Sequence, residues 1–300
     1  MASGQGGVSP PFGARPAMTE GRARGTGQKK WRPGGHKGAP RGRPKSRKPA
    51  APGALAETDD GLVRLFGSHA VEAALGNARR TAHRLLATEN AERRLADVIR
   101  ASGVAVERTT PGELDRLLGT DTVHQGLMLE ADPLPEPDLA ELVERAAEVG
   151  PLVLLDHVTD PHNAGAVLRS AAAFGASGVV MTRRHSPPLN GVLAKSASGA
   201  LDLVPVLMVQ NLARTMLDLK DLGFRLIGLE GTSVARLEDE TFAGPSALVL
   251  GAEGKGLRQL TAETCDQLVS ITTGGPLASL NVSNAAAVAL HWAAIARRKS

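Results

Sequence analysis

The pattern that most restricts the fold of this 300-residue chain is the alternation of apolar runs and helical segments that begins after Pro151. The apolar runs have the length of strands, and the stretches between them have helical periodicity. Strands joined through helices pair in parallel, and the helices then cover both faces of the sheet. The pattern therefore predicts an α/β domain with a mostly parallel sheet, which on this pattern alone would be Rossmann-like. Strands are expected near residues 152–155, 178–181, 204–207, 225–229, 247–250 and 267–271.

Two of the expected strands lead directly into polar loops. The apolar run from Leu152 is followed by a polar turn, and a helix is expected to begin near Asn163 and to end at Gly175. Arg169 follows Asn163 by six residues, so it is expected under two turns further along this helix and on a nearby face. The apolar run at 247–250 opens into the sequence Gly-Ala-Glu-Gly-Lys-Gly. Open α/β sheets bind their ligands at the carboxyl ends of the strands. Both loops are therefore candidate ligand-binding loops.

A third loop lies near the C-terminus, where the sequence from Gly274 to Leu290 joins a glycine-rich stretch, a polar cluster and an alanine-rich helix. Glycine lets a ligand approach the main chain closely, because it has no Cβ atom. Asn281 and Ser283 can cap the following helix, whose free N–H groups then point into the loop. Alone, this segment could be an ordinary loop and helix cap. Together with the other two loops, it predicts a site for a small polar molecule.

The three loops resemble the three sequence motifs of the SpoU (TrmH) family of RNA ribose 2′-O-methyltransferases, within the SPOUT superfamily. Asn163-Ala-Gly165 with Arg169 is similar to the first motif, Gly251 to Gly256 to the second, and Ser279 to Ser283 to the third. The resemblance implies S-adenosylmethionine as methyl donor, no metal, and RNA as substrate. It also implies a deep trefoil knot, and a homodimer with the active site close to the subunit interface. Knots are nearly absent from protein folds, so periodicity alone predicts none.

The region before this domain resembles one branch of the family. Phe66 to Leu75 and Val123 to Gly126 are similar to the start and end of a small domain related to ribosomal protein L30e, and Asn211 to Arg214 also resembles that branch. The resemblance implies methylation of a guanosine ribose in large-subunit ribosomal RNA, at the peptidyl-transferase region.

The predicted domain order follows from these resemblances and from breaks in the pattern. We expect a disordered basic extension at 1–60, an L30e-like RNA-binding domain at 61–134, a linker at 135–150 and a catalytic domain at 151–300. A proline-rich stretch at 133–137 breaks regular structure and marks the linker. Before the catalytic domain, helices are expected at 69–75, 91–102, 114–118 and 139–148, and strands at 84–88, 104–108 and 126–131.

The resemblance also implies which residues contact the methyl donor. Main-chain groups of three residues would hold its adenosine and methionine parts, and two further residues would lie beside them. The first three are Gly251, Ile271 and Leu280, and the other two are Ser279 and Gly231. Two departures from the family pattern lie beside this loop: Thr272-Thr273 stands where many relatives have Pro-Met, and Asn284 where a small aliphatic residue is common. They bear on the affinity for the methyl donor rather than on the reaction type.

Four residues are expected at the reacting ribose. Arg169 would act either as the base that takes the 2′-hydroxyl proton or as a group that positions this hydroxyl and a phosphate. A guanidinium stays protonated up to about pH 12, which favours the positioning role. Glu253 and Asn281 would orient Arg169 and the substrate, and Asn163 would hold the first loop together.

Each of these residues also has a purely structural interpretation. Arg169 could be a surface helix arginine, Glu253 a carboxylate that caps its loop, and Asn281 a helix cap. His157 and His162, beside the first motif, are interpreted as loop histidines with a structural role, because no carboxylate–histidine spacing indicates a ligand set.

Charge is distributed unevenly along the chain. Residues 1–53 contain 12 Lys and Arg and one acid, a formal charge of +11, whereas the rest has 23 basic and 30 acidic residues, a charge of −7. The first segment also has few aliphatic residues, so it is expected to be disordered and to bind RNA phosphates, or else to serve only as a solubilising tail.

Cysteine content and hydropathy narrow the class of protein further. The single Cys265 excludes an internal disulfide framework and a cysteine metal cage, and is expected to be a buried small hydrophobe. No apolar run approaches a membrane span and no signal segment precedes the first domain, so a cytoplasmic protein is expected.

Three functions remain open at this point. The first is a large-subunit ribosomal RNA guanosine 2′-O-methyltransferase, favoured by the His-Gln-Gly ending of the small domain. The second is a ribose methyltransferase of the same family that acts on transfer RNA or on another ribosomal site. The third is a non-catalytic RNA-binding assembly factor, which the presence of Arg169, Glu253, Ser279 and Asn281 disfavours.

Overall fold

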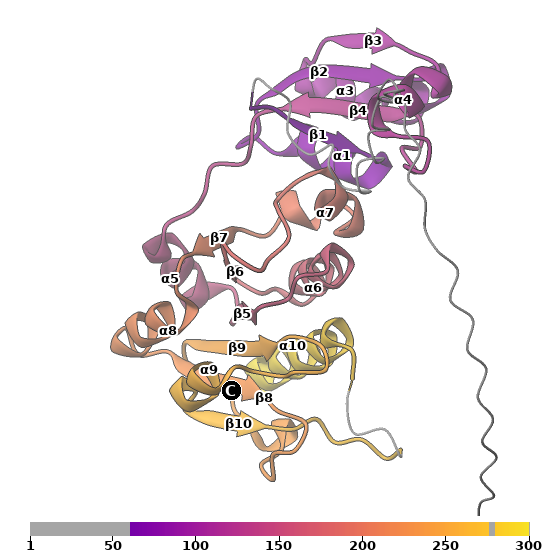
Figure 1. Cartoon of the computed structure of the whole chain (residues 1–300). Helices are drawn as coiled ribbons and strands as arrows, with labels where there is room; N and C mark the ends of the chain where they lie inside the picture. The colour runs from indigo at the N-terminus through magenta and orange to yellow at the C-terminus, as the bar shows by residue number, and fades with distance from the viewer. Residues whose placement is uncertain (1–60, 276–279, 300) are drawn as a thin grey trace, which may run out of the picture. The chain divides into compact units, whose positions relative to one another are not determined.

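The computed structural model describes residues 61–275 and 280–299, so the basic extension predicted at 1–60 and Ser279 lie outside the described residues. The first part of the described chain forms a four-stranded sheet in the order β1-β4-β2-β3, with four helices (Figure 1). Strands β2 and β3 pair in parallel, and the other pairs are antiparallel. Its elements are β1 (Val63–Phe66), α1 (Ser68–Gly76), β2 (Ala82–Ala87), α2 (Glu89–Arg94), α3 (Ala96–Ser102), β3 (Val106–Arg108), α4 (Pro111–Leu118) and β4 (Leu127–Ala131).

Two features of this small sheet differ from the sequence prediction. Strand β1 was not predicted, because its four residues are too few for a clear alternation; it is stabilised by pairing along β4. The helix predicted at 91–102 is divided into α2 and α3, since Leu95 has a non-helical φ/ψ of −107° and 19°.

The second part forms a six-stranded sheet in the order β10-β8-β9-β5-β6-β7, in which every pair is parallel. This confirms the predicted α/β fold with a parallel sheet. Helix α5 (Leu139–Glu148) precedes the sheet, as predicted. The remaining elements are β5 (Leu152–Asp156), α6 (Pro161–Phe174), β6 (Gly178–Thr182), α7 (Gly191–Ser196), η1 (Ala200–Asp202), β7 (Val206–Val209), α8 (Leu212–Asp221), β8 (Arg225–Leu229), η2 (Leu237–Asp239), β9 (Ser246–Gly251), α9 (Gln259–Thr264), β10 (Gln267–Val269) and α10 (Val282–Lys299).

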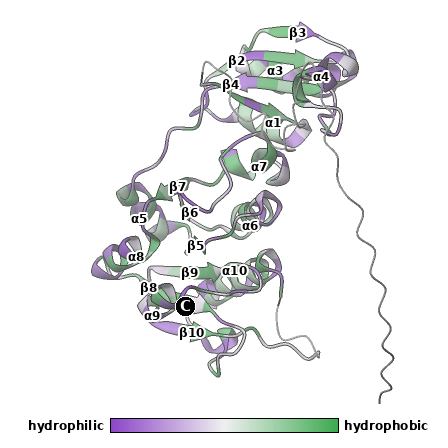
Figure 2. Ribbon diagram, in the orientation of Figure 1, coloured by the Kyte–Doolittle hydropathy of each residue, from purple (hydrophilic) through white to green (hydrophobic). Residues whose placement is uncertain are grey.

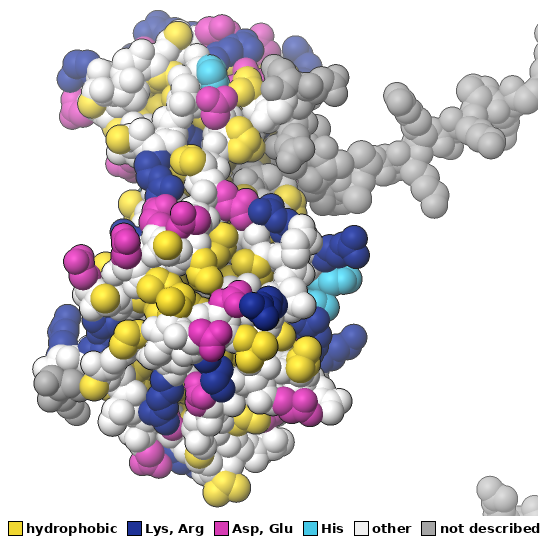
Figure 3. Space-filling model, turned by 90° about the vertical axis from the view of Figure 1, so that its left-hand side faces the viewer, with side chains coloured by type: hydrophobic (Ala, Val, Ile, Leu, Met, Phe, Trp, Pro, Cys, Tyr) yellow, Lys and Arg dark blue, Asp and Glu magenta, His cyan; other side chains and the backbone are white. Residues whose placement is uncertain are grey.

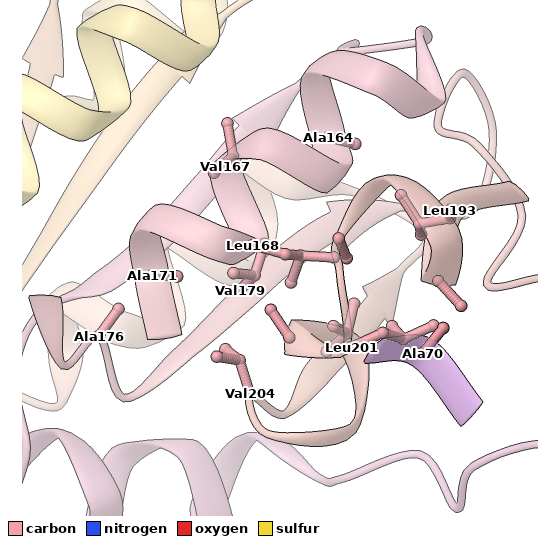
Figure 4. Close-up of a cluster of buried hydrophobic side chains, with 14 of the residues drawn as sticks. Ala70, Ala164, Val167, Leu168, Ala171, Ala176, Val179, Leu193, Leu201 and Val204 are labelled. Carbon is pink, nitrogen blue, oxygen red and sulfur yellow. The ribbon is translucent and has the colours of Figure 1, made fainter. Parts of the chain in front are cut away.

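Alternate residues of the central strands face two different hydrophobic clusters. In β5, Val153 and Leu155 pack with α6 and α10, whereas Leu152 and Leu154 pack with α5 and α8. Both faces are therefore covered, which is why β5, β6 and β9 are almost continuously hydrophobic (Figure 2). Figure 4 shows the first cluster, where Val167, Leu168 and Ala171 of α6 lie beside Val179 and residues of α7 and η1.

The helix of the first motif is fixed at both ends by local interactions. Asp160 caps α6 by accepting a hydrogen bond from the main-chain N–H of His162 at 2.9 Å, and Pro161 occupies the first turn. Gly175, at a left-handed φ of 72°, ends the helix. The helix therefore begins two residues earlier than predicted and ends where predicted. Strand β7 begins two residues later than predicted, after Pro205, which has no N–H to donate.

A buried ion pair connects the small sheet to η1. The Arg80 guanidinium donates to both carboxylate oxygens of Asp202, at 2.8 and 3.1 Å, and the two side chains are only 2% and 1% exposed. Arg80 also donates to the carbonyl of Asp132, and Asn77 donates to Asp202. All strong polar groups of the pair are therefore satisfied, as buried charges require.

Charged side chains of both signs are interspersed on the face drawn in Figure 3, and Lys, Arg and His side chains lie together at its right-hand edge. In the described part of the chain, no helix combines the length and the apolar content needed to span a bilayer.

Candidate active site

A cavity of about 360 Å³ lies at the carboxyl ends of β8, β9 and β10. It is lined by residues at the ends of these three strands, in the loops that follow them and at the start of α10. Four of the predicted donor-binding residues line it, together with Glu253 of the second motif. The lining comprises residues 229–232, 250–256, 269–271, Thr273, Leu280, Val282 and Ala285, and so includes Gly231, Gly251, Ile271 and Leu280.

The loop after β9 folds back on itself so closely that Gly251 cannot be replaced without movement. The N–H of Gly256 donates to the carbonyl of Ala252 at 2.9 Å. A Cβ atom at Gly251 would lie 2.1 Å from the carbonyl carbon of Gly256. Gly254 and Gly256 have φ values of 76° and 67°, in the left-handed region that favours glycine.

Three polar side chains from the three motifs meet at the edge of this cavity. The Nδ2 of Asn163, on α6, donates to Glu253 Oε2 at 3.1 Å. The Nδ2 of Asn281 donates to Asn163 Oδ1 at 3.0 Å and to Glu253 Oε1 at 3.4 Å. The structure thus brings together residues 163, 253 and 281. Because the carboxylate accepts from both amides, its orientation is fixed by side chains distant in sequence.

Asn281 also caps the final helix. Its Oδ1 accepts from the main-chain N–H of Ser283 at 2.8 Å and from the Ser283 hydroxyl at 2.6 Å. The same side chain therefore uses its oxygen for the helix and its nitrogen for the polar cluster. The two interpretations of Asn281 that the sequence left open are both compatible with this geometry.

Arg169 is not joined to this cluster. It lies exposed on α6, does not line the cavity, and makes no hydrogen bond or ion pair with any residue in the described ranges. Asn163 and Arg169 are six residues apart, which corresponds to about 240° of rotation around a helix. The two side chains therefore project in different directions from α6, contrary to our expectation that they share a nearby face.

The residues that depart from the family pattern have defined contacts. The N–H and hydroxyl of Thr272 both bind the Glu238 carboxylate, at 3.1 Å each. Burial opposes ionisation of Glu238, but its hydrogen bonds, including those from Thr272, lower the pKa of this carboxyl below its usual value. Thr273 lines the cavity and Asn284 is exposed on α10. Thr272 therefore connects the segment that follows β10 to η2 through Glu238.

Sequence reasoning missed some residues of the site. Glu230, Thr232 and Lys255 also line the cavity. The sequence signal for Glu230 and Thr232 is their position just after a strand, and Lys255 lies within the second motif without having been singled out. Asp156, at the end of β5, is buried and accepts hydrogen bonds from the N–H and Nε of Arg258 at 3.0 and 2.7 Å. This interaction fixes the end of the second-motif loop to the central strand.

The chain matches two families of known proteins over most of the described sequence. Residues 150–291 match the SpoU rRNA Methylase family, and residues 64–137 match the family described as RNA 2′-O ribose methyltransferase substrate binding. A relative from Ralstonia nicotianae, the 23S rRNA (guanosine-2′-O-)-methyltransferase RlmB, is 43% identical over 76% of this chain and 94% of its own length.

Solved structures have the same fold. The SpoU methyltransferase AviRb from Streptomyces viridochromogenes, in complex with its cofactor AdoMet, superposes with a TM-score of 0.69 at 24% identity, covering 82% of this chain and 96% of that one. A putative RNA methyltransferase of the TrmH family from Porphyromonas gingivalis gives a TM-score of 0.64 at 26% identity, covering 80% and 91%.

Proposed function

The chain belongs to the SpoU rRNA methylase family, and on that premise we propose that it methylates the ribose 2′-hydroxyl of a guanosine in 23S ribosomal RNA. The observation that carries this proposal is the meeting of Asn163, Glu253 and Asn281 beside a cavity that Glu253 lines. The 43% identical relative, covered almost in full, has this activity in its name.

The cavity fits S-adenosylmethionine as methyl donor. Its volume of about 360 Å³ lies in the usual range for small-molecule sites, roughly 300–1,000 Å³. Apolar side chains such as Ile271 and Leu280 offer a surface for an adenine, and the main chain near Gly251 offers hydrogen-bonding groups. When bound, this molecule supplies an electrophilic methyl group on a sulfonium centre. Gly231 and Ser279 complete the proposed set of donor-binding residues.

The polar residues prepare the ribose for transfer. The 2′-hydroxyl must be held in line with the methyl group and must lose its proton, and the developing negative charge must be stabilised. We assign Arg169 to positioning this hydroxyl and the adjacent phosphate, because a guanidinium keeps its proton at physiological pH. Glu253, held by the two asparagines, would orient the substrate; its expected contact with Arg169 is not made within the described residues of this chain.

A homodimer would explain why Arg169 stands apart from the cluster. The helices α6 and α10 pack against each other, and Arg169 is exposed on the first of them. In a dimer formed through these helices, Arg169 would lie at the interface, close to the active site. The alanine-rich α10 has small side chains that allow near approach of a second helix. Sedimentation at micromolar concentration should therefore show a dimer, and an active monomer would contradict this assignment.

The remaining proposed features are the knot, the domain arrangement and the cellular location that the family resemblance implies. The loops after β9 and β10 would be tied in the deep trefoil knot of the SPOUT superfamily, and residues 61–134 would form an L30e-like domain that binds RNA. The linker would cover 135–150, the catalytic domain 151–300, and the basic extension at 1–60 would attract RNA phosphates. The enzyme would act in the cytoplasm, where its proposed substrate is assembled.

Transfer assays test the proposal directly. Purified protein should methylate 23S ribosomal RNA in the presence of S-adenosylmethionine, and the 2′-O-methyl site should map to a guanosine. Methylation of transfer RNA or of another ribosomal site instead would favour the second function. An absence of both transfer and donor binding in calorimetry would favour the assembly factor.

Substitution of Arg169 tests its assigned role. Arg169→Ala should abolish transfer and leave donor affinity within a few-fold, because Arg169 does not line the cavity. Arg100→Ala, at another exposed helix arginine, serves as the matched control and should keep full activity. If Arg169→Ala keeps more than a tenth of wild-type turnover, the assignment is wrong.

A further inference from the structure

A second hollow, of about 410 Å³, lies at the carboxyl ends of β5, β6 and β7. The second-motif loop connects the two cavities. Residues 251–256 line the donor cavity, and Arg258 at the end of the loop lines this hollow together with Leu260 and Thr261 of α9. The two hollows therefore lie on either side of the second-motif loop. We call the second one the histidine pocket; its other lining residues are His157, Thr182, Arg184, His185, Gln210, Asn211, Leu212 and Ala213.

Two stacked histidines define this pocket. The ring centroids of His157 and His185 are 4.4 Å apart, with the ring planes inclined by 33°. Both residues have left-handed backbone conformations, with φ values of 59° and 65°, and they make up half of the non-glycine residues with positive φ in the described ranges. A left-handed conformation costs free energy in such a residue and persists mainly where a function uses it. The Thr182 hydroxyl donates to the carbonyl of Arg184 and thereby holds the turn that presents His185.

The pocket is positively charged. None of its described lining residues is acidic, and two of them are arginines. Arg258 binds the buried Asp156 through its N–H and Nε only, and no described residue accepts a hydrogen bond from its Nη groups, so these remain available on a side chain that is 48% exposed. The ten-residue helix α8 begins at the pocket with Leu212 and adds the positive end of its dipole.

The histidine rings are suited to stacking against a nucleotide base rather than to binding a phosphate. Burial, together with the nearby Arg258 charge, lowers the pKa of His157, so its ring is neutral at physiological pH. His185 is exposed, so one face of the ring pair is open to solvent. Single-stranded RNA is bound by proteins through stacking of bases on aromatic rings, His included, and through contacts of arginine with phosphate.

We propose that the histidine pocket binds the nucleotide next to the methylated one, with its base stacked on His185 and its phosphate held by Arg184 and Arg258. This assignment rests on the proposed function, because it places the RNA strand across the second-motif loop with the target ribose at the donor cavity. Its residues would fix which neighbouring nucleotides the enzyme accepts, and they take no part in the transfer itself.

RNA binding by the full-length protein tests the assignment without any transfer step. The probe is a fluorescently labelled single-stranded RNA of the 23S target region, followed by anisotropy with no methyl donor present. His185→Gly removes the ring and also the strain of the left-handed backbone conformation. The affinity for RNA should therefore fall at least about fivefold, the lower limit for the loss of one base stack. His185→Phe retains a ring and should restore binding to within twofold of wild type. A merely structural role would give the opposite order, because glycine suits the left-handed conformation better.

The phosphate contact has its own readout. Arg184→Ala should weaken binding and make the slope of log Kd against log salt shallower by about 0.7, the value for one phosphate on a single strand. Arg214→Ala, an exposed arginine on α8 outside the pocket, should leave both quantities unchanged. In transfer assays the His185 and Arg184 variants should raise KM for RNA and leave kcat unchanged.

Three results would overturn the proposal: unchanged RNA affinity in His185→Gly, an unchanged salt slope in Arg184→Ala, or a fall in kcat at constant KM. Failure of the proposed function can be distinguished from failure of this pocket assignment. In the first case the wild-type protein would transfer no methyl group, whereas the differences in RNA binding between the variants would still be measurable.

Discussion

Replacing Asn281 with aspartate separates the two roles of this side chain. Its oxygen caps α10 through the N–H of Ser283, and its nitrogen donates to Asn163 and Glu253. Aspartate keeps the accepting oxygen, so the helix cap remains. It puts a charged oxygen where the donating nitrogen was, facing the Glu253 carboxylate. The substitution therefore removes the polar cluster and spares the fold.

The size of the effect follows from the contact distances. At the 3.4 Å that separates Asn281 Nδ2 from Glu253 Oε1, two like charges repel by about 1 kcal/mol in water and about 5 kcal/mol at an effective permittivity of 20. Glu253 is exposed, so screening by solvent favours the lower value. Two lost hydrogen bonds add about 0.5–1.5 kcal/mol each. The cluster should thus be destabilised by roughly 2 kcal/mol or more, which corresponds to about a 30-fold loss of rate.

The assay compares turnover at saturating RNA and methyl donor with a thermal melt of the same protein. Asn281→Asp should lower kcat at least tenfold, and the loss of roughly 2 kcal/mol should lower Tm by about 4–8 °C while the cooperative unfolding transition remains. Asn281→Ala should lower kcat as well and lose about 1 kcal/mol of stability with the cap. Ser283→Ala, which leaves the Asn281 nitrogen in place, is the control and should keep its turnover. If Asn281→Asp keeps more than half of wild-type turnover, Asn281 is a helix cap alone.

Three further substitutions, one of them with a control variant, test other parts of the structure. Gly251→Ala would place a Cβ 2.1 Å from main-chain carbon across its loop, so calorimetry should show donor affinity falling at least tenfold, and wild-type affinity would refute the close approach. Asp202→Ala leaves a buried arginine unpaired and should lower the free energy of unfolding in urea by about 3–5 kcal/mol. Arg100→Ala, in an exposed pair, should change it by less than about 1 kcal/mol, and equal effects would contradict the role of burial. Thr272→Pro removes an N–H that donates to Glu238 and should cost about 0.5–1.5 kcal/mol at pH 7. Because the pKa of Glu238 is lowered on folding, this stabilisation is present above the ordinary carboxyl pKa of 4.5 and should be lost as the pH falls through the lower pKa of the folded state. If the free-energy cost of Thr272→Pro stays constant from about pH 7 to about pH 3, the carboxylate charge plays no part.

The sequence predicted those features that depend on local pattern. The buried strands β5, β6 and β9 could be recognised because both of their faces are covered, which makes them continuously hydrophobic. Their parallel pairing followed from the helices between them. Strand β1 was missed because its stability comes from β4, more than sixty residues away in the chain. A pairing at such a separation leaves no trace in the local sequence.

The candidate site was predictable to a similar degree. Residues 163, 253 and 281 were singled out from the loops that follow the strands, and the structure joins them by hydrogen bonds. Arg169 is separated from them because six residues rotate a helix by about 240°. The prediction of a nearby face did not take this rotation into account. Of the histidine pair, the sequence singled out only His157, as a loop residue, and His185 was missed. Their stacking depends on the neighbouring positions of β5 and β6 and on two left-handed backbone conformations.

The walls of the donor cavity have a consequence for inhibitor design. Residues 250–256 line it, and the peptide groups of this loop are chemically the same in any relative that keeps the loop conformation. A competitive inhibitor that reproduces the donor would therefore meet nearly equal surfaces across the family and show little selectivity. Thr273 also lines the cavity, at a position where this chain departs from the family pattern that its sequence resembles. A substituent directed at its hydroxyl would be the most direct route to a compound that distinguishes this enzyme.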